Sequence, residues 1–273
     1  MAKRVQYPFH SLEDFLTSRA LHVDGQLNDG WGAEFPVKGR EIYATVLFAD
    51  ITAFSERTRD LTPAETLIFV NNFFAWISAE TIRGTPGIVD KYIGDEVMVV
   101  YSEEFGSKDP FADAVRAARW MAQNDALGFS PHIGIASGRV IVGYAGTPLK
   151  YNCSVFGAPM AIAARCAAVK VQREHPYGAV VVFPATDWGD RDLREVIPPQ
   201  HCEGRDGEIV ELPYDWELSD PREEIVKTTT LQIRELVKTG IWLPYPGSGP
   251  EDRARRGLSD LRRSGLYRPD LAD

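Results

Sequence analysis

The apolar and polar residues of this chain form short strand-like runs that alternate with longer helix-like runs. A run of β-branched and aromatic residues at 41–51 predicts a buried strand. Residues 62–84 predict a helix, because Thr62 suits its N-cap and Glu65 completes a capping box. Two apolar runs on either side of residues 94–95 predict a β-hairpin, since a Gly-Asp pair suits a two-residue turn.

The rest of the pattern adds elements of both kinds. A short helix is expected to begin after Ser11, which is a good N-cap residue. Further helices are expected at 109–128, 157–172 and 223–240, and further strands at 151–156, 178–184 and 208–218. Residues 130–146 predict two strands joined through Ser137-Gly138. Because strand-to-strand and strand-to-helix steps both occur, we expect an α+β fold with a mixed or antiparallel sheet flanked by helices.

Charge and composition narrow the classes of partner. A formal net charge of -9 over 273 residues argues against a general nucleic-acid binder. The three cysteines, Cys153, Cys166 and Cys202, are odd in number and lack metal-ligand spacing, which argues against a disulfide framework. The first ten residues lack the apolar segment of a signal peptide, and no apolar run approaches the ~20 residues of a membrane span. We therefore expect a cytoplasmic protein without membrane contact.

Two aspartates lie beside runs that predict core strands. Asp50 lies near the end of the run 41–51, and Asp95 lies at the tip of the predicted hairpin. Two carboxylates that come together repel each other unless a cation lies between them. Mg²⁺ takes one or two carboxylates together with water and phosphate oxygens. A metal–triphosphate site is thus one interpretation, and a helix cap for Asp50 and a turn residue at Asp95 are the alternatives.

Four blocks in order along the chain resemble the class III nucleotide cyclases, the adenylate and guanylate cyclase family: FADITAF, KYIGDE, IGIASGRVIVGYAG and YNCSVFGAPMAIAARC. The resemblance implies a nucleotide cyclase catalytic domain at 41–215, which leaves an N-terminal extension at 1–40 and a C-terminal helix and tail at 216–273. It implies a ferredoxin-like core and a homodimer whose catalytic domains pair head to tail around shared active sites. The implied reaction is attack of the ribose 3′-oxygen of a nucleoside triphosphate on its α-phosphate. The products are a 3′,5′-cyclic nucleotide and pyrophosphate.

The resemblance also implies roles for individual residues. Asp50 and Asp95 match the two metal-binding aspartates, and Ile51 would lend a backbone carbonyl. The implied cofactors are two divalent cations per site, Mn²⁺ or Mg²⁺, which would activate the 3′-hydroxyl and neutralise the terminal phosphates. Arg165 matches the arginine that stabilises the transition state. Backbone N–H groups that open the next helix could hold phosphate, and these belong to Thr52, Ala53, Phe54 and Ser55.

The base-reading and phosphate-binding positions of the family are matched only in part. Lys91 matches the base-reading lysine, whereas Ser154 stands where adenylate cyclases have an aspartate. An arginine that often contacts the terminal phosphates falls near His132, and the expected helix asparagine falls on Ala161. Arg205 is the candidate for the C-terminal phosphate-binding lysine.

The Lys91–Ser154 pair favours a base that has both a carbonyl and a ring N–H, because lysine only donates and serine can donate or accept. Uracil has both groups. Guanine has them too, but guanylate cyclases usually replace the lysine with a glutamate. Tyr92, Tyr151 and Phe156 flank the pair and could narrow the pocket, with core packing as their alternative role.

The layout of the chain and this pocket are similar to the pyrimidine cyclases of bacterial Pycsar antiphage systems. Those enzymes make cyclic UMP or cyclic CMP and activate a separate effector protein. The sequence therefore predicts a uridylate cyclase. Cytidylate or adenylate cyclase activity is the first alternative, and a catalytically inactive regulatory cyclase homology domain is the second.

Overall fold

The structure is a computed structural model of the chain. It describes residues 9–19, 23–26, 36–81, 84–123, 128–147, 150–169, 180–203, 206–226 and 229–239, together with Ser259 and Arg263. Arg205 and nearly all of the predicted tail lie outside these described residues.

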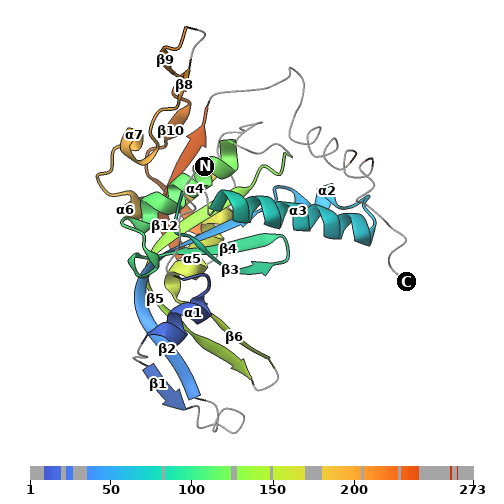
Figure 1. Ribbon diagram of the computed structural model, residues 1–273, viewed down its shortest axis with the longest axis vertical. Helices are drawn as coiled ribbons and strands as arrows, with labels where there is room; N and C mark the ends of the chain where they lie inside the picture. Colours follow the sequence, from blue (N-terminus) through green and yellow to red (C-terminus); the bar gives the residue numbers. More distant parts are fainter. Residues whose placement is uncertain are drawn as a thin grey trace.

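One large mixed sheet organises the fold (Figure 1). Its main path runs in the order β10 (Trp216–Leu218), β12 (Thr229–Lys238), β7 (Val180–Pro184), β5 (His132–Thr147), β2 (Pro36–Asp50), β4 (Glu96–Tyr101) and β3 (Ile88–Ile93). Three more strands pair with this path, namely β1 (Val23–Gln26), β6 (Lys150–Phe156) and β11 (Arg222–Val226). Strands β5 and β7 run parallel, and the other strand pairs among the described residues are antiparallel. The predicted α+β fold with a mixed sheet is confirmed.

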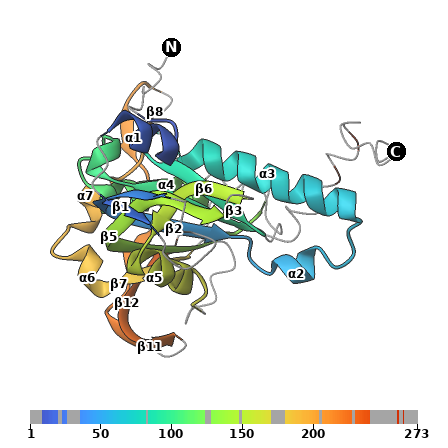
Figure 2. The same cartoon turned by 90° about the horizontal axis from the view of Figure 1, so that it is seen from below.

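Helices cover both faces of this sheet. α3 (Pro63–Thr81) and α4 (Pro110–Gln123) pack on one face, and α1 (Leu12–Ser18) and α5 (Ala158–Ala167) pack on the other. Figure 2 shows α3 and α5 on opposite sides of the sheet. Short helical turns complete the connections, namely α2 (Phe54–Arg57), η1 (Glu103–Phe105), α6 (Ala185–Trp188) and α7 (Leu193–Val196). A separate ribbon of β8 (His201–Glu203) and β9 (Ile209–Glu211) protrudes from this body in Figure 1.

The two faces of β2 explain why its sequence is a continuous apolar run. Leu47 and Ala49 lie in the core beneath α3 and α4, whereas Val46 and Phe48 lie in the core beneath α1 and α5. This is the side-chain alternation of a strand whose two faces are both covered. The strand then ends at Asp50, so a rigid core element positions that carboxylate.

The predicted starts of three helices are confirmed by their caps. The side chain of Ser11 accepts a hydrogen bond from the N–H of Asp14 at 3.0 Å. Thr62 N–H donates to Glu65 Oε2 at 2.8 Å, and Glu65 N–H donates to Thr62 Oγ1 at 3.3 Å, which is a capping box. Asp109 accepts from the N–H group of the third residue after it at 3.1 Å and so caps α4.

Helix α5 lies unusually close to strand β5. A Cβ atom at Gly134 would lie 2.0 Å from Ala163 O and 2.2 Å from Ala167 N, so only glycine fits there. Ala163 and Ala167 are themselves buried. The alanine-rich sequence therefore permits a close helix–sheet contact, and this contact sets the position of Arg165 on α5.

Three predictions of local structure are wrong. Residues 208–218 do not form one strand, because β9 ends at Glu211 and pairs with β8 in a separate sheet, whereas β10 begins at Trp216 and pairs with β12. The described residues within 223–240 do not form a helix, because they form strands β11 and β12, and β12 joins the main sheet beside β7. Residues 130–146 do not form two strands. Ser137 and Gly138 continue β5 as one strand, with Thr45 and Ala44 of β2 as their register partners.

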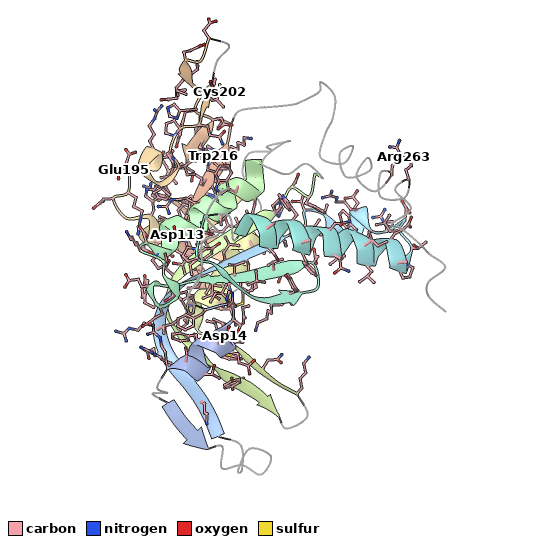
Figure 3. All side chains as sticks on the ribbon, in the orientation of Figure 1. Asp14, Asp113, Glu195, Cys202, Trp216 and Arg263 are labelled. Carbon is pink, nitrogen blue, oxygen red and sulfur yellow. The ribbon has the colours of Figure 1, made fainter. Side chains whose placement is uncertain are left out.

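None of the helices among the described residues is both long and apolar enough to cross a membrane. The three cysteines are unbridged, as expected from their odd number and spacing. Cys166 is buried, whereas Cys202 is exposed on strand β8 of the protruding ribbon (Figure 3).

Candidate active site

Asp50 and Asp95 meet where the interior strand β2 ends and the β3–β4 hairpin turns. Asp50, Asp95 and Glu96 together form the acidic edge of the sheet. Asp50 is the last residue of β2, and its register partner on β4 is Glu96. Asp95 directly precedes Glu96 in the turn of the β3–β4 hairpin, where Gly94 has a φ of +64°, a conformation that favours glycine. The Asp95 carboxylate accepts a hydrogen bond from the backbone N–H of Ile51. The structure therefore brings together the two aspartates that the sequence singles out.

Negative charge is concentrated at this edge. Burial, together with the charges of Asp95 and Glu96, raises the pKa of Asp50 to about 7. Burial also raises the pKa of Asp95 and that of Glu96, and the charge of Asp95 raises the pKa of Glu96 further. Glu96 was not predicted as a site residue, although its place directly after Asp95 could have indicated it.

The carboxylate of Asp50 has an unsatisfied oxygen. Its Oδ1 is buried and has no hydrogen-bond partner, and Nδ1 of His132, the register partner of Asp50 on β5, lies 3.9 Å away. Because burial lowers the pKa of His132, its imidazole is neutral at pH 7 and does not offset the negative charge.

The oxygen donors at this edge fit a divalent cation. Carboxylate and carbonyl oxygens are the ligands that Mg²⁺ and Mn²⁺ prefer. Within the described part of the chain, no group of three or more carboxylate, imidazole or thiol side chains is arranged to hold a metal alone. A cation at Asp50 and Asp95 would therefore take further ligands from outside these side chains, as a bound triphosphate would supply.

The segment after Asp50 forms a tight loop. Ala53 adopts a left-handed conformation, with φ 54° and ψ 36°, which is uncommon for a residue other than glycine. The Ile51 carbonyl accepts a hydrogen bond from Phe54 N–H at 3.3 Å and keeps a second lone pair for another ligand. Thr52 donates its hydroxyl to the carbonyl of Ser130, which also has a positive φ.

Arg57 fixes this loop to the strand-entry segment before β5. Its guanidinium donates to the carbonyl of Gly128 at 2.6 Å and to that of Phe129 at 2.8 Å. The loop residues Ala53 and Ser55 remain exposed beside the acidic edge. Arg57 was not predicted as a functional residue; an arginine two residues after the predicted phosphate-binding segment 52–55 is the signal that could have indicated it.

Lys91 and Ser154 meet at a second place, although they lie far apart in the sequence. Lys91 Nζ donates a hydrogen bond to Ser154 Oγ, and Ser154 Oγ donates to Asp90 Oδ2 at 2.8 Å. Lys91 Nζ also lies 3.3 Å from Asp90 Oδ2. The side chain of Asp90 is only 1% exposed, whereas that of Lys91 is 34% exposed. The predicted pair thus forms, and Asp90 is a third member that was not predicted.

Solved structures that share this fold are nucleotide cyclases. The adenylyl cyclase CyaB from P. aeruginosa gives a TM-score of 0.54 at 17% identity, over 75% of this chain and 98% of CyaB. The guanylyl cyclase Cya2 gives a TM-score of 0.51 at 19% identity, over 76% of this chain and 97% of Cya2. A bacterial light-regulated adenylyl cyclase gives 0.53 at 21% identity, over 83% of this chain and 58% of that chain. The chain has the fold of a class III nucleotide cyclase catalytic domain.

The chain is also similar to curated protein sequences. Uncharacterized protein Rv1318c of Mycobacterium tuberculosis is 31% identical over 130 residues, which cover 46% of this chain and 24% of the relative. Uncharacterized protein Rv1319c of the same organism is 27% identical over 141 residues, which cover 50% of this chain and 26% of the relative. The chain thus spans about a quarter of the length of the curated relatives it matches. No model of a known protein family matches it.

Within one chain, Arg165 hydrogen-bonds to a residue outside the acidic edge. Its Nη1 donates to Thr229 Oγ1 at the start of β12, at 3.2 Å. One chain therefore brings the two aspartates together without the predicted catalytic arginine.

The aromatic residues near Lys91 divide into two roles. The ring of Phe156 lies 5.9 Å from Lys91 Nζ and flanks the base-reading pair. Tyr92 instead stacks on Phe74 of α3, with ring centroids 4.2 Å apart, and its hydroxyl is hydrogen-bonded to Ser78 at 2.9 Å. Tyr92 is thus a packing residue in one chain, and the side chain of Tyr151 lies outside the described part of the structure.

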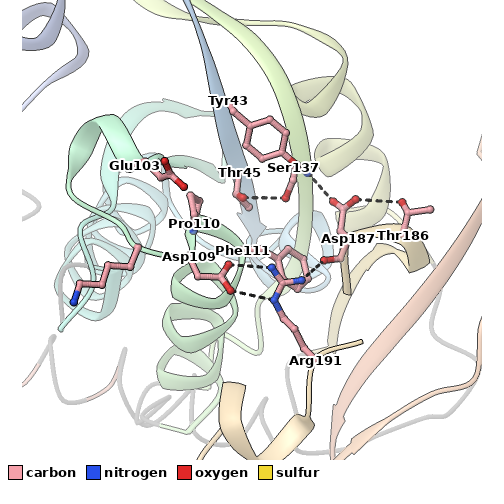
Figure 4. A pocket seen from close by; sticks show the side chains of 11 residues that line it. Tyr43, Thr45, Glu103, Asp109, Pro110, Phe111, Ser137, Thr186, Asp187 and Arg191 are labelled. Atoms are coloured by element: carbon pink, nitrogen blue, oxygen red, sulfur yellow. Dashed lines mark hydrogen bonds and ion pairs between the residues drawn. The ribbon is translucent and has the colours of Figure 1, made fainter. Parts of the chain in front are cut away.

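A cavity of about 470 Å³ lies farther along β2 and β5 (Figure 4). Thr45 and Ser137 are hydrogen-bonded at 2.9 Å, and Ser137 N–H donates to Asp187 at 2.7 Å. Arg191 makes two 3.1 Å hydrogen bonds to Asp109. Because these polar groups satisfy one another and the lining includes no predicted site residue, the cavity is separate from the candidate active site.

Proposed function

We propose that the chain is a nucleotide cyclase, which converts a nucleoside triphosphate into a 3′,5′-cyclic nucleotide and pyrophosphate. The observation that carries this proposal is the meeting of Asp50 and Asp95 at one sheet edge, with a buried oxygen of Asp50 that lacks a hydrogen-bond partner. The fold shared with adenylyl and guanylyl cyclases supports it.

Each part of the acidic edge has a role in this proposal. Asp50, Asp95 and the Ile51 carbonyl would hold two divalent cations, Mg²⁺ or Mn²⁺, and the loop 52–55 and His132 would contact the triphosphate. Bound cations would favour ionisation of the ribose 3′-hydroxyl and offset phosphate charge. Because the nucleophile belongs to the substrate itself, residues that orient the triphosphate would supply much of the rate.

The proposed assembly is a homodimer with shared sites. One protomer would supply Asp50 and Asp95, and its partner would supply Lys91, Ser154 and Arg165. In support, Arg165 hydrogen-bonds to Thr229 and Lys91 hydrogen-bonds to Ser154 within one chain, so neither side chain is engaged with the acidic edge of its own chain.

UTP is the proposed substrate, and cyclic UMP the proposed product. The support is the Lys91–Ser154 pair, in which Ser154 would accept from a ring N–H and Lys91 would donate to the adjacent carbonyl. We further propose that cyclic UMP acts in the cytoplasm on a separate effector protein in antiphage defence. Cytidylate or adenylate cyclase activity is the alternative within the same reaction class.

A regulatory domain without activity is the alternative from a different class. Ala161 in place of the family's asparagine favours it, whereas the presence of Asp50, Asp95 and Arg165 favours an enzyme. The test is to incubate the purified chain with Mn²⁺ and, separately, each of the four ribonucleoside triphosphates. A cyclic nucleotide and pyrophosphate in equal amounts would support the proposal. Binding of a triphosphate without turnover would support the regulatory alternative.

A further inference from the structure

Strand β3 contains an irregularity at Asp90. Val89 pairs with Val99 of β4, and Lys91 pairs with Met98, so Asp90 is an extra residue without a partner in the register. Successive side chains of a regular strand point to opposite faces, whereas a bulge re-aims one of them. The irregularity explains how Asp90 and Lys91, which are adjacent in sequence, both reach Ser154 Oγ.

The chemistry of the three groups determines the direction of each hydrogen bond. An ionised carboxylate only accepts and an ammonium group only donates. The Ser154 hydroxyl must therefore give its hydrogen to Asp90 and accept from Lys91. Ser154 therefore has one lone pair left to accept a hydrogen bond from a ligand. Lys91 has N–H groups left to donate one.

We propose that Asp90 is a positioning residue for base recognition, which holds the Ser154 hydrogen and so makes Ser154 an acceptor beside the donor Lys91. This inference rests on the proposed cyclase function. Asp90 and Ser154 are both buried, with the Asp90 side chain 1% exposed and Ser154 3% exposed, whereas the Lys91 side chain is 34% exposed, so a base would reach this cluster from the side of Lys91. The effect of Asp90 on the substrate would pass through Ser154.

The proposal changes how the pair would contact uracil. Ser154 would accept from the ring N–H, and Lys91 would donate to the adjacent carbonyl. A hydroxyl that is free to rotate could instead donate or accept, and would suit several base edges equally well. Asp90 would thus confine Ser154 to bases that place a hydrogen-bond donor opposite it, whereas a serine alone would suit either a donor or an acceptor there.

The test compares selectivity among the variants Asp90→Asn, Ser154→Ala and Glu235→Gln in the full chain. Selectivity is the ratio of kcat/KM for the preferred triphosphate to that for each of the other three, measured with Mn²⁺. The amide introduced by Asp90→Asn could donate or accept, so we expect the ratio to fall by about tenfold or more, the size of one charged hydrogen bond. A general loss of stability would lower kcat/KM for all four triphosphates alike and leave the ratio unchanged.

Glu235→Gln is the matched control, because Glu235 is also a buried carboxylate paired with a neighbouring side chain, that of Arg222 at 3.2 Å. We expect it to lower stability and leave the ratio within about threefold of wild type, below the effect of one hydrogen bond. Ser154→Ala should lower the ratio as Asp90→Asn does. In the Ser154→Ala background, Asp90→Asn should change the ratio little further, since the two residues would act as one unit.

The outcomes separate the two proposals. If folded Asp90→Asn keeps the wild-type selectivity ratio, the role of Asp90 is overturned and the cyclase proposal stays intact. If Asp90→Asn does not fold, a wild-type ratio in Ser154→Ala has the same meaning. An undiminished effect of Asp90→Asn in the Ser154→Ala background also overturns it. If the wild-type chain cyclises none of the four triphosphates, the proposed function fails, and the inference fails with it.

Discussion

Asp50 carries a charge that its surroundings disfavour. Its carboxylate is partly buried, lies near Asp95 and Glu96, and has one oxygen without a hydrogen-bond partner. A carboxylate in such a place destabilises the folded chain unless a cation is bound. The same features that cost stability would make the group an effective cation ligand.

The stability of the metal-free chain should therefore fall as pH rises. Asp50 has a folded-state pKa of about 7 against an ordinary value of 3.8, so the folded state binds a proton more tightly across that range. We expect Asp50→Asn to melt at a higher temperature than wild type at pH 8 in EDTA. The melting temperature should rise by about 2–4 °C for each kcal/mol gained in the free energy of unfolding. The difference between the two proteins should be smaller at pH 5. Scanning calorimetry measures it.

The exposed Asp60 provides a control for this experiment, since Asp60→Asn removes the same charge from a solvated position and should leave the melting temperature nearly unchanged. Mn²⁺ should stabilise the wild-type chain and have little effect on Asp50→Asn. Equal melting temperatures of wild type and Asp50→Asn at pH 8 would show that Asp50 carries no such penalty.

The two aspartates also permit a direct test of catalysis. We expect Asp50→Ala or Asp95→Ala to abolish product formation while the fold survives, because neither side chain fills core volume. Product formation and circular dichroism together check this. Turnover near the wild-type level in either variant would rule out the two-metal assignment.

Single residues were predictable where the sequence placed them at the end of an apolar run. Asp50 and Asp95 belong to this group. Asp90 was not predictable in the same way, because its contact with Ser154 depends on an irregular register in β3 that no residue pattern indicates. Arg57 was missed because its partners are backbone carbonyls of a distant loop.

At the scale of elements, strands and helices with clear caps or turns were predicted correctly, and long-range pairing decided the rest. Residues 223–240 contain seven Glu, Lys and Leu residues, which favour helix, but also eight Thr, Ile and Val residues, which favour strands. Burial alternates along β12 over residues 229–235, and the strand pairs with β7, β10 and β11. Ser137-Gly138 has the composition of a turn, but pairing with β2 keeps β5 continuous. Neither neighbour was visible from the local sequence.

The contact between α5 and β5 gives a prediction at this scale. Gly134→Ala would place a Cβ within 2.2 Å of two backbone atoms of α5, so the helix must move. We expect a loss of about 3 kcal/mol or more in the free energy of unfolding, at the upper end of overpacking costs. Urea denaturation measures this loss.

Gly94→Ala is the comparison for this prediction. Gly94 has a φ of +64° but no atom within 4 Å of its added Cβ, so only backbone strain of about 1–2 kcal/mol applies. Equal stabilities of the two variants would contradict the close packing of α5 on β5.

At the scale of the whole molecule, the described chain holds its candidate residues in separate places. The acidic edge contains Asp50 and Asp95, whereas Lys91, Ser154 and Arg165 make other contacts within the chain. A two-fold dimer would let each protomer complete the site of the other, since a two-fold interface pairs each patch with its counterpart.

Shared sites make a prediction about mixtures of inactive variants. Asp50→Ala and Arg165→Ala should each be inactive alone, and mixing them should restore activity, because one of the two sites in a mixed dimer would be intact. The measurement is product formation after subunit exchange, with the oligomeric state followed by light scattering. No rescue despite proven exchange, or a monomer at catalytic concentrations, would contradict shared sites.

The central claim is cyclisation of a nucleoside triphosphate, and a competition assay tests it most directly. The purified chain and its Asp50→Ala variant are each given UTP, CTP, ATP and GTP at equal concentration with Mn²⁺, and the products are separated and identified. We predict that the wild-type chain forms a 3′,5′-cyclic nucleotide, chiefly cyclic UMP, with an equal amount of pyrophosphate, and that Asp50→Ala forms none. Chiefly cyclic AMP or cyclic GMP would overturn the proposed base preference alone. No cyclic nucleotide from any of the four triphosphates, or the same product from Asp50→Ala, would contradict the assignment of the chain as a cyclase that works through this site.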